Sequence, residues 1–96
     1  MTESITIGTN EQRLIRVMQL LGDATRFKMF KILSSSQELC VSEMAQQLDI
    51  SPSAVSQHFR NFEILGLVTK ERTGQKICYV LQEDAFVNEL KQLTKI

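Results

Sequence analysis

Apolar residues in the middle of the chain recur with the period of a helix, stop, and then recur again. Met44, Ala45 and Leu48 lie on one face of a helix. Pro52 disfavours helical geometry at the residue before it, Ser51, so this first helix must end near residue 48 or 49. The pattern therefore predicts a short helix followed by a tight turn.

A second helix is expected directly after this turn. We expect Ser42 to be the N-cap of the first helix and Ser51 that of the second, where Pro52 fits the first helical position. Gly66 is expected to end the second helix as a left-handed cap. The apolar stripe of this helix consists of Val55, Phe59, Phe62 and Leu65.

The opposite face of the second helix carries short polar side chains and one cation, which are Ser53, Ser56, Gln57 and Arg60. Gln and Arg side chains make bidentate contacts with base edges, and Ser lets the backbone come close to DNA. This pattern is typical of a helix-turn-helix, whose second helix enters the major groove. The alternative is an ordinary helical hairpin with a solvated polar face.

Beyond Gly66 the pattern changes to strands. Residues 67–72 and 76–81 are expected to form a two-stranded ribbon, with Gly74 in the turn between them. A ribbon that follows a recognition helix is a wing, and residues 39–41 can supply its third strand. The expected contacts with the DNA backbone are His58, Lys70, Arg72, Gln75 and Lys76; for His58 the alternative is packing inside the protein.

The first and last helices carry more apolar surface than a small domain needs. We expect a flexible arm over residues 1–10 and a single domain over 11–96, with helices at 11–21, 24–33 and 83–95. The first and last helices are expected to pair with a second copy, although the first could equally be buried in its own chain. The expected interface residues are Leu14, Val17, Met18, Leu21, Phe86, Leu90 and Leu93. A symmetric dimer would present two recognition helices to an inverted repeat in double-stranded DNA.

Composition narrows the classes further. The chain has 96 residues, which suits one domain, and its 11 Lys and Arg residues balance 11 Asp and Glu residues. Net charge therefore gives no sign of nucleic acid, which keeps a winged-helix module that binds protein as a competing function. The sequence contains no membrane span, no signal peptide and no secreted disulfide framework, so we expect a cytoplasmic protein. It also lacks the residue sets of an enzyme.

The expected order of helix, helix, short strand, helix-turn-helix, wing and helix is a mainly α (α+β) fold. It resembles the ArsR/SmtB family of prokaryotic winged-helix repressors. The matching motifs are Leu-Gly-Asp-Ala-Thr-Arg-Phe-Lys-Met-Phe at 21–30, Glu-Leu-Cys-Val-Ser-Glu-Met-Ala at 38–45, Ser-Pro-Ser-Ala-Val-Ser-Gln-His-Phe at 51–59, Leu-Gly-Leu-Val at 65–68 and Gly-Gln-Lys-Ile-Cys-Tyr-Val-Leu at 74–81. The resemblance implies a homodimer built on the first and last helices, and a repressor that leaves its operator when an inducer binds.

The chain departs from this family at both of the family's metal sites. The family's thiolate site uses Cys-x-Cys, where this chain has Cys40 and then Ser42. The family's site on the last helix uses Asp, His and Glu, where this chain keeps Asp84 and Glu89 without a histidine. We therefore expect no cofactor and no metal, and a metal response would need an incomplete or intersubunit cysteine site.

The two cysteines suggest another kind of response. In winged-helix domains the strand before the helix-turn-helix usually pairs with the last wing strand, which would bring Cys40 near Cys78. Our hypothesis is that the two thiols form a disulfide or sulfur bridge that shifts this strand, making the protein a redox or sulfide sensor. The alternative is that both are small buried hydrophobic residues.

Overall fold

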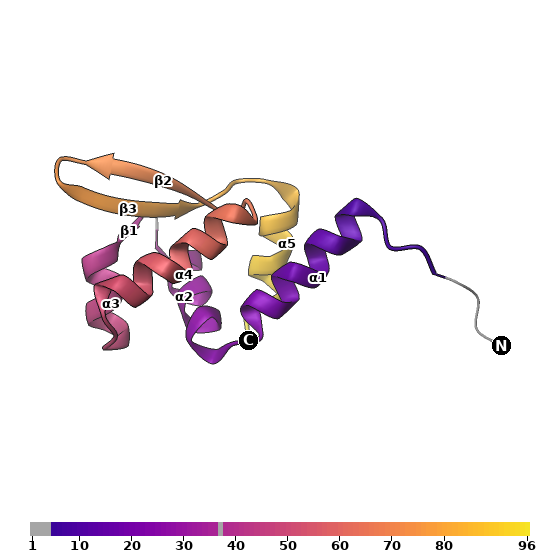
Figure 1. Ribbon diagram of the computed structural model, residues 1–96, viewed down its shortest axis with the longest axis horizontal. Coiled ribbons are helices and arrows are strands. Elements are labelled where there is room, and N and C mark those ends of the chain that lie inside the picture. Colours follow the sequence, from indigo (N-terminus) through magenta and orange to yellow (C-terminus); the bar gives the residue numbers. More distant parts are fainter. Residues whose placement is uncertain (1–4, 37) are drawn as a thin grey trace.

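The computed structural model describes residues 5–36 and 38–96, which form five helices and one small sheet (Figure 1). The elements are, in chain order, α1 (Thr9–Leu21), α2 (Ala24–Ser34), β1 (Leu39–Cys40), α3 (Val41–Leu48), α4 (Pro52–Ile64), β2 (Val68–Thr73), β3 (Lys76–Leu81) and α5 (Ala85–Leu93). The expected fold class and element order are confirmed. In the described part of the chain, no helix is long and apolar enough to cross a membrane.

The sheet is antiparallel and has the strand order β1-β3-β2. β2 and β3 form the wing, and the short strand β1 pairs with the edge of β3 that faces away from β2, as expected. The register places Leu39 opposite Tyr79 and Cys40 opposite Cys78. β1 therefore ties the segment that enters the helix-turn-helix to the middle strand of the sheet.

The hydrophobic core lies against the sheet, and all five helices contribute buried residues to it. Phe59 and Phe62 of α4 are fully buried in it, together with Phe30 of α2 and Met44 of α3. The Phe59 ring stacks on the Tyr79 ring of β3, with 4.1 Å between the ring centroids. This stacking packs the recognition helix directly against the wing.

The turn between α3 and α4 forms for the reasons that the sequence indicated. Asp49 ends α3 in the left-handed region with φ 54°, a conformation that Asp tolerates better than most residues. The Oγ of Ser51 accepts a hydrogen bond from the Ala54 N–H at 3.1 Å, and Pro52 occupies the first helical position. Gly66, just beyond α4, has φ 72°, so the expected left-handed glycine is also present.

The start of α3 differs from the prediction. α3 begins at Val41 with Cys40 as its N-cap, so Ser42, the expected N-cap, lies inside the first turn. The reason is the Glu43 carboxylate, which accepts the Cys40 N–H at 2.9 Å and so stabilises an earlier start.

The same mechanism shifts the start of α1. This helix begins at Thr9 with Gly8 as its N-cap, and the Glu11 carboxylate accepts the Gly8 N–H at 2.9 Å. Asn10, which directly precedes the predicted start at residue 11, is a helical residue, and the helix takes in two residues of the expected arm. Residues 1–4 of that arm lie outside the described residues.

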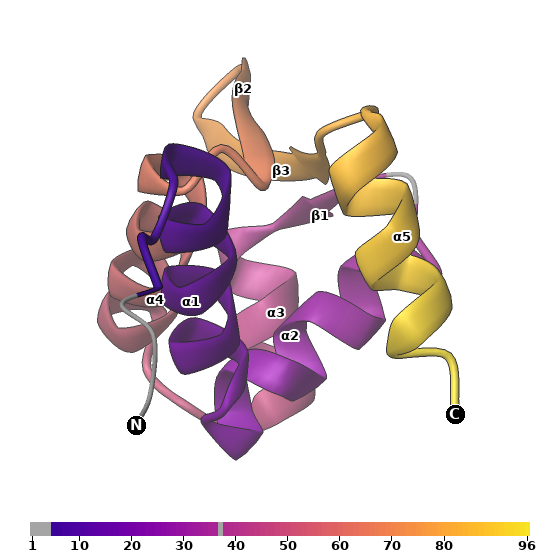
Figure 2. The ribbon, with the colours of Figure 1, turned by 90° about the vertical axis from the view of Figure 1, so that its right-hand side faces the viewer.

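The last helix is shorter than expected. α5 covers Ala85–Leu93 instead of 83–95. It starts later because the Asp84 carboxylate caps it by accepting the Val87 N–H at 2.8 Å, and it ends earlier with Thr94 as its C-cap. Figure 2 shows α5 on one side of the molecule and α1 on the other, in front of α4, with α2 and α3 between the two sides.

Candidate DNA-binding surface and cysteine pair

The outer face of α4 presents the residues that the sequence singled out for base contacts. Ser53, Ser56, Gln57 and Arg60 are all exposed, and they lie opposite the buried stripe of the helix. Because that stripe packs into the core, the orientation of the polar face is set by the inner side chains. Amide, hydroxyl and guanidinium groups on a rigid helix are suited to hydrogen bonds with base edges in a major groove.

The wing carries the expected cations at its exposed positions. Lys70 and Arg72 lie on β2, Lys76 begins β3, and Gln75 lies in the turn, where Gly74 has φ 63°. All four of the predicted wing residues are exposed. Glu71 also lies on β2, but the three cations outnumber it. The wing therefore has a net positive charge, which suits contact with a phosphate backbone.

The recognition helix and the wing enclose a shared hollow of about 260 Å³. Pro52 and Ser56 of α4 line one side, Gln75 and Lys76 of the wing line another, and Cys40 also borders it. The structure thus brings residues predicted for base and backbone contacts around one concavity, and places the α3 N-terminus next to it.

His58 is placed differently from the other predicted backbone contacts. It is half-buried, and its Nδ1 atom is buried without a hydrogen-bond partner among the described residues. Burial lowers the pKa of His58; the nearby Arg26 guanidinium lowers it further, whereas the Asp23 carboxylate raises it. This position agrees with the packing alternative, and a phosphate contact by His58 stays a prediction.

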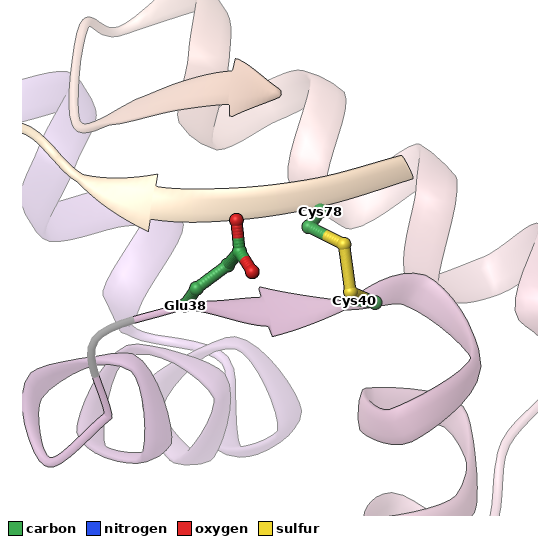
Figure 3. A group of neighbouring side chains, drawn as sticks. All are labelled: Glu38, Cys40 and Cys78. Carbon is green, nitrogen blue, oxygen red and sulfur yellow. A yellow bond between two sulfur atoms is a disulfide. The ribbon is translucent and has the colours of Figure 1, made fainter. Parts of the chain in front are cut away.

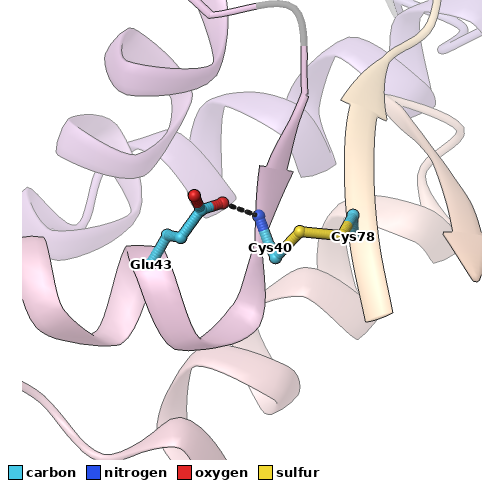
Figure 4. Close-up of a disulfide and its surroundings, with 3 residues drawn as sticks. All are labelled: Cys40, Glu43 and Cys78. Carbon is cyan, nitrogen blue, oxygen red and sulfur yellow. Dashed lines mark hydrogen bonds between the residues drawn. A yellow bond between two sulfur atoms is a disulfide. The ribbon is translucent and has the colours of Figure 1, made fainter. Parts of the chain in front are cut away.

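Cys40 and Cys78 form a disulfide across β1 and β3, with their Cα atoms 3.7 Å apart (Figure 4). Both residues are buried, Cys40 at 7% exposure and Cys78 at 1%. Cys40 is also the N-cap of α3, so one sulfur of the disulfide lies at the N-terminal end of that helix. The bridge therefore joins the first helix of the helix-turn-helix to the wing.

Glu38 is a neighbour of this pair that the sequence analysis did not single out. Its carboxylate and the two sulfur atoms lie within 4.8 Å of one another (Figure 3). The spacing was a usable signal, because residues two apart on a strand share a face and Glu38 precedes Cys40 by two. Two thiolates and a carboxylate are ligands that thiophilic cations accept.

The predicted interface residues divide into two groups. Val17 and Leu90 are buried in the core of the single chain, and Leu21 and Phe86 are half-buried. The exposed members are Leu14 at 41%, Met18 at 64% and Leu93 at 73%. An open hollow of about 670 Å³ connects α1 with α5 and is lined by Leu14, Phe86, Glu89, Leu90, Gln92 and Leu93.

The comparisons with known proteins agree with this geometry. Residues 23–70 match the family model of the bacterial regulatory proteins of the arsR family. A cadmium resistance transcriptional regulatory protein, CadC homolog, of Staphylococcus aureus is 30% identical over 86 residues, covering 90% of this chain and 68% of that protein.

Two solved structures show the same fold. HlyU from Vibrio cholerae is 26% identical with a TM-score of 0.78, covering 88% of this chain and 90% of that one. The homodimeric winged helix-turn-helix DNA-binding domain of a possible ArsR-family regulator from Mycobacterium bovis is 20% identical with a TM-score of 0.78, covering 99% and 86%.

The fold and the exposed face of α4 are those of a winged helix-turn-helix transcription regulator. The chain belongs to the arsR family of bacterial regulatory proteins, and it is a DNA-binding regulator.

Proposed function

We propose that the protein is a homodimeric repressor that reads an inverted repeat in double-stranded DNA. The observation that carries this proposal is the pairing of a fully packed inner face of α4 with an outer face of four exposed polar residues. α4 reads bases through Ser53, Ser56, Gln57 and Arg60. The wing grips the neighbouring backbone through Lys70, Arg72, Gln75 and Lys76.

The second copy is proposed to cover the apolar surface of α1 and α5. Leu14, Met18 and Leu93 are large apolar side chains left exposed on these helices, and the hollow between Leu14 and Leu93 is open to solvent. Val17 and Leu90 support this surface from beneath, because they already belong to the core. A twofold contact here would present two copies of α4 about one DNA turn apart.

Oxidation of the cysteine pair is proposed to release the repressor. Two thiols lose two electrons and two protons to an oxidant of the disulfide or peroxide class, and the Cys40–Cys78 bond forms. In the reduced chain, β1 and β3 are joined at this point by backbone pairing alone. The added covalent link fixes the start of α3 against β3 and so restrains the helix-turn-helix relative to the wing.

The test of DNA reading is a binding-site selection with the reduced protein, followed by footprinting of the selected DNA. The proposal predicts an inverted repeat with half-site centres about one helical turn apart, and affinity that falls with the logarithm of salt concentration. Selection of a single, unrepeated site would contradict the dimeric mode. Recovery of no preferred sequence at all would contradict sequence-specific repression.

A metal response is a second candidate, and the cluster of Glu38, Cys40 and Cys78 is the observation that favours it. Only the reduced chain could bind, because both sulfurs are used in the disulfide. Cadmium ion added to the reduced protein should produce ultraviolet sulfur-to-metal absorption at one equivalent per chain. This candidate also predicts weaker cadmium binding for Glu38→Gln; equal binding by Cys40→Ser would contradict it.

A further inference from the structure

We propose that Arg13 is a positioning residue that holds the recognition helix at a fixed orientation to the dimer surface. The proposal rests on the dimeric DNA reading proposed above. It concerns how the two halves of the dimer are aligned, a role that none of the DNA-facing residues can perform.

Arg13 reaches from α1 to the end of α4. Its Nε donates to the Leu65 carbonyl at 3.1 Å, and its Nη2 lies 3.4 Å from the Gly66 carbonyl, which also accepts from it. These carbonyls follow the last turn of α4, where helices leave acceptors unsatisfied and where a cation is favoured. A side chain from another helix thus completes the C-terminal end of the recognition helix.

The same side chain also contacts α5. The Arg13 guanidinium carbon lies 4.4 Å from the centre of the Phe86 ring, a cation–π contact. One guanidinium group therefore joins the two helices of the proposed dimer surface to the recognition helix. Phe86 also borders the open hollow of that surface, as does Leu14, the residue next to Arg13.

Arg13 is the least exposed residue in the first half of α1. Among residues 9–16, all of which the structure describes, every residue except Arg13 is exposed. The buried residues of α1, Val17 and Leu20, lie in its second half. Without the Arg13 contacts, the first half of α1 would be free to change its angle to α4 while the core stayed packed.

Gly66 fits this contact. A Cβ built at Gly66 would lie 3.3 Å from the Arg13 Nη2, and Gly66 has a positive φ of 72°. The positive φ favours glycine here, and a Cβ at this position would press on the guanidinium group, which would have to shift by a few tenths of an ångström. The segment that links α4 to the wing therefore lies against the Arg13 side chain.

The consequence concerns spacing. In a symmetric dimer, the distance between the two recognition helices depends on the angle between each α4 and the dimer surface. A fixed angle makes the protein select one half-site spacing, whereas a loose angle lets it accept several. Arg13 is thus expected to determine the spacing preference without touching DNA.

The experiment compares Arg13→Gln with Arg16→Gln, since Arg16 is an exposed arginine one turn further along α1. The reduced variants are titrated onto a selected inverted repeat, onto the same repeat with one base pair added or removed between half-sites, and onto an isolated half-site. Sedimentation and thermal unfolding are measured on the same samples.

Arg13→Gln is expected to lower affinity for the optimal repeat about ten-fold and to reduce the preference for its spacing. Half-site affinity and the dimer fraction should match those of Arg16→Gln. Arg13→Lys, which keeps the charge but loses the planar fork, should recover part of the spacing preference.

Equal losses on half-site and full repeat would overturn the proposal, and so would a dissociated dimer, because either places Arg13 in another role. Unfolding of both Arg13→Gln and Arg13→Lys would also overturn it. If the wild type itself showed no preference for the full repeat, the dimeric reading would fail, which is a separate result read from the wild-type titration alone.

Discussion

The two ends of the molecule bury their apolar side chains to very different degrees. In α4, Val55, Phe59 and Phe62 are fully buried, and the exposed face is almost wholly polar. In α1, Met18 is 64% exposed, and in α5 Leu93 is 73% exposed. The apolar face of α4 is therefore fully covered within one chain, whereas we expect the exposed apolar surface of α1 and α5 to be covered by a second copy.

The largest effect on stability should come from a substitution in the packed core beneath α4. Phe59→Ala removes the ring that stacks on Tyr79 at the centre of the core. We expect a loss of about 3–5 kcal/mol in the free energy of unfolding, measured by urea denaturation. Ile64→Ala on the same helix, where the side chain is 72% exposed, is the control and should change stability by less than about 0.5 kcal/mol. Similar losses of stability in both variants would show that the buried face of α4 contributes no more to folding than its exposed face.

A substitution on the exposed surface of α1 and α5 should weaken dimer formation more than it weakens folding. Met18→Glu places a charge on the exposed surface of α1 and should weaken the dimer at least about ten-fold in sedimentation experiments, because the carboxylate would be desolvated in the interface. The midpoint of unfolding at low protein concentration should hardly change. Gln47→Glu, which adds a carboxylate at an exposed position of α3, should leave the dimer intact. A dimer unaffected by Met18→Glu would exclude this surface as the interface.

Two substitutions separate base contacts made by α4 from backbone contacts made by the wing. Gln57→Ala should cost about 1–3 kcal/mol on the selected sequence and relax the preference at one base position. Lys76→Ala should weaken binding to all DNA alike and flatten the salt dependence by about one unit of slope. Anisotropy titrations at several salt concentrations measure both. A sequence effect from Lys76→Ala together with none from Gln57→Ala would reverse the assigned roles.

The smallest effect concerns acid sensitivity at the join between α2 and α4. Because burial lowers the pKa of His58 in the folded chain, the unfolded chain takes up a proton more readily as the pH falls through about 6.5. Stability from the neutral side chain is thus present above this pH and lost below it. The lowered pKa of Asp23 acts in a more acidic range.

Thermal unfolding between pH 7.5 and 5.5 measures this contribution. The wild type should lose more stability on acidification than His58→Gln, by less than about 1 kcal/mol, since the partly exposed ring is screened by solvent. A parallel decline in the two proteins would show that His58 does not titrate in this window.

Much of this contrast could be predicted from the sequence because its signals are local. Ser51 and Pro52 mark the start of α4, and the pairing of Cys40 with Cys78 followed from strand order in winged-helix domains. The cap of α3 was missed because the Glu43 side chain, three residues after Cys40, decides where the helix starts. A serine at the N-cap and a glutamate at the third helical position both mark helix starts, and the pattern of apolar residues does not choose between them.

Long-range contacts explain the remaining gaps. Arg13 binds a carbonyl 52 residues away, and no periodicity in α1 distinguishes it from Arg16. Val17 and Met18 both belong to the predicted interface, as do Leu90 and Leu93, yet in each pair the first residue is buried and the second exposed. Sequence patterns identify a helix face, whereas the depth of each residue on that face depends on the partner helix.

The most direct test of the account is a titration of the selected operator with fully reduced and fully oxidised protein, together with the same titration of Cys40→Ser and Cys78→Ser. Intact mass confirms the loss of two hydrogens in the oxidised wild type. We expect tight, salt-dependent binding by the reduced wild type, binding at least about ten-fold weaker after oxidation, and no response to oxidant in either variant. Equal affinity of the reduced and oxidised wild type would contradict a regulator whose DNA binding is controlled by the Cys40–Cys78 bond.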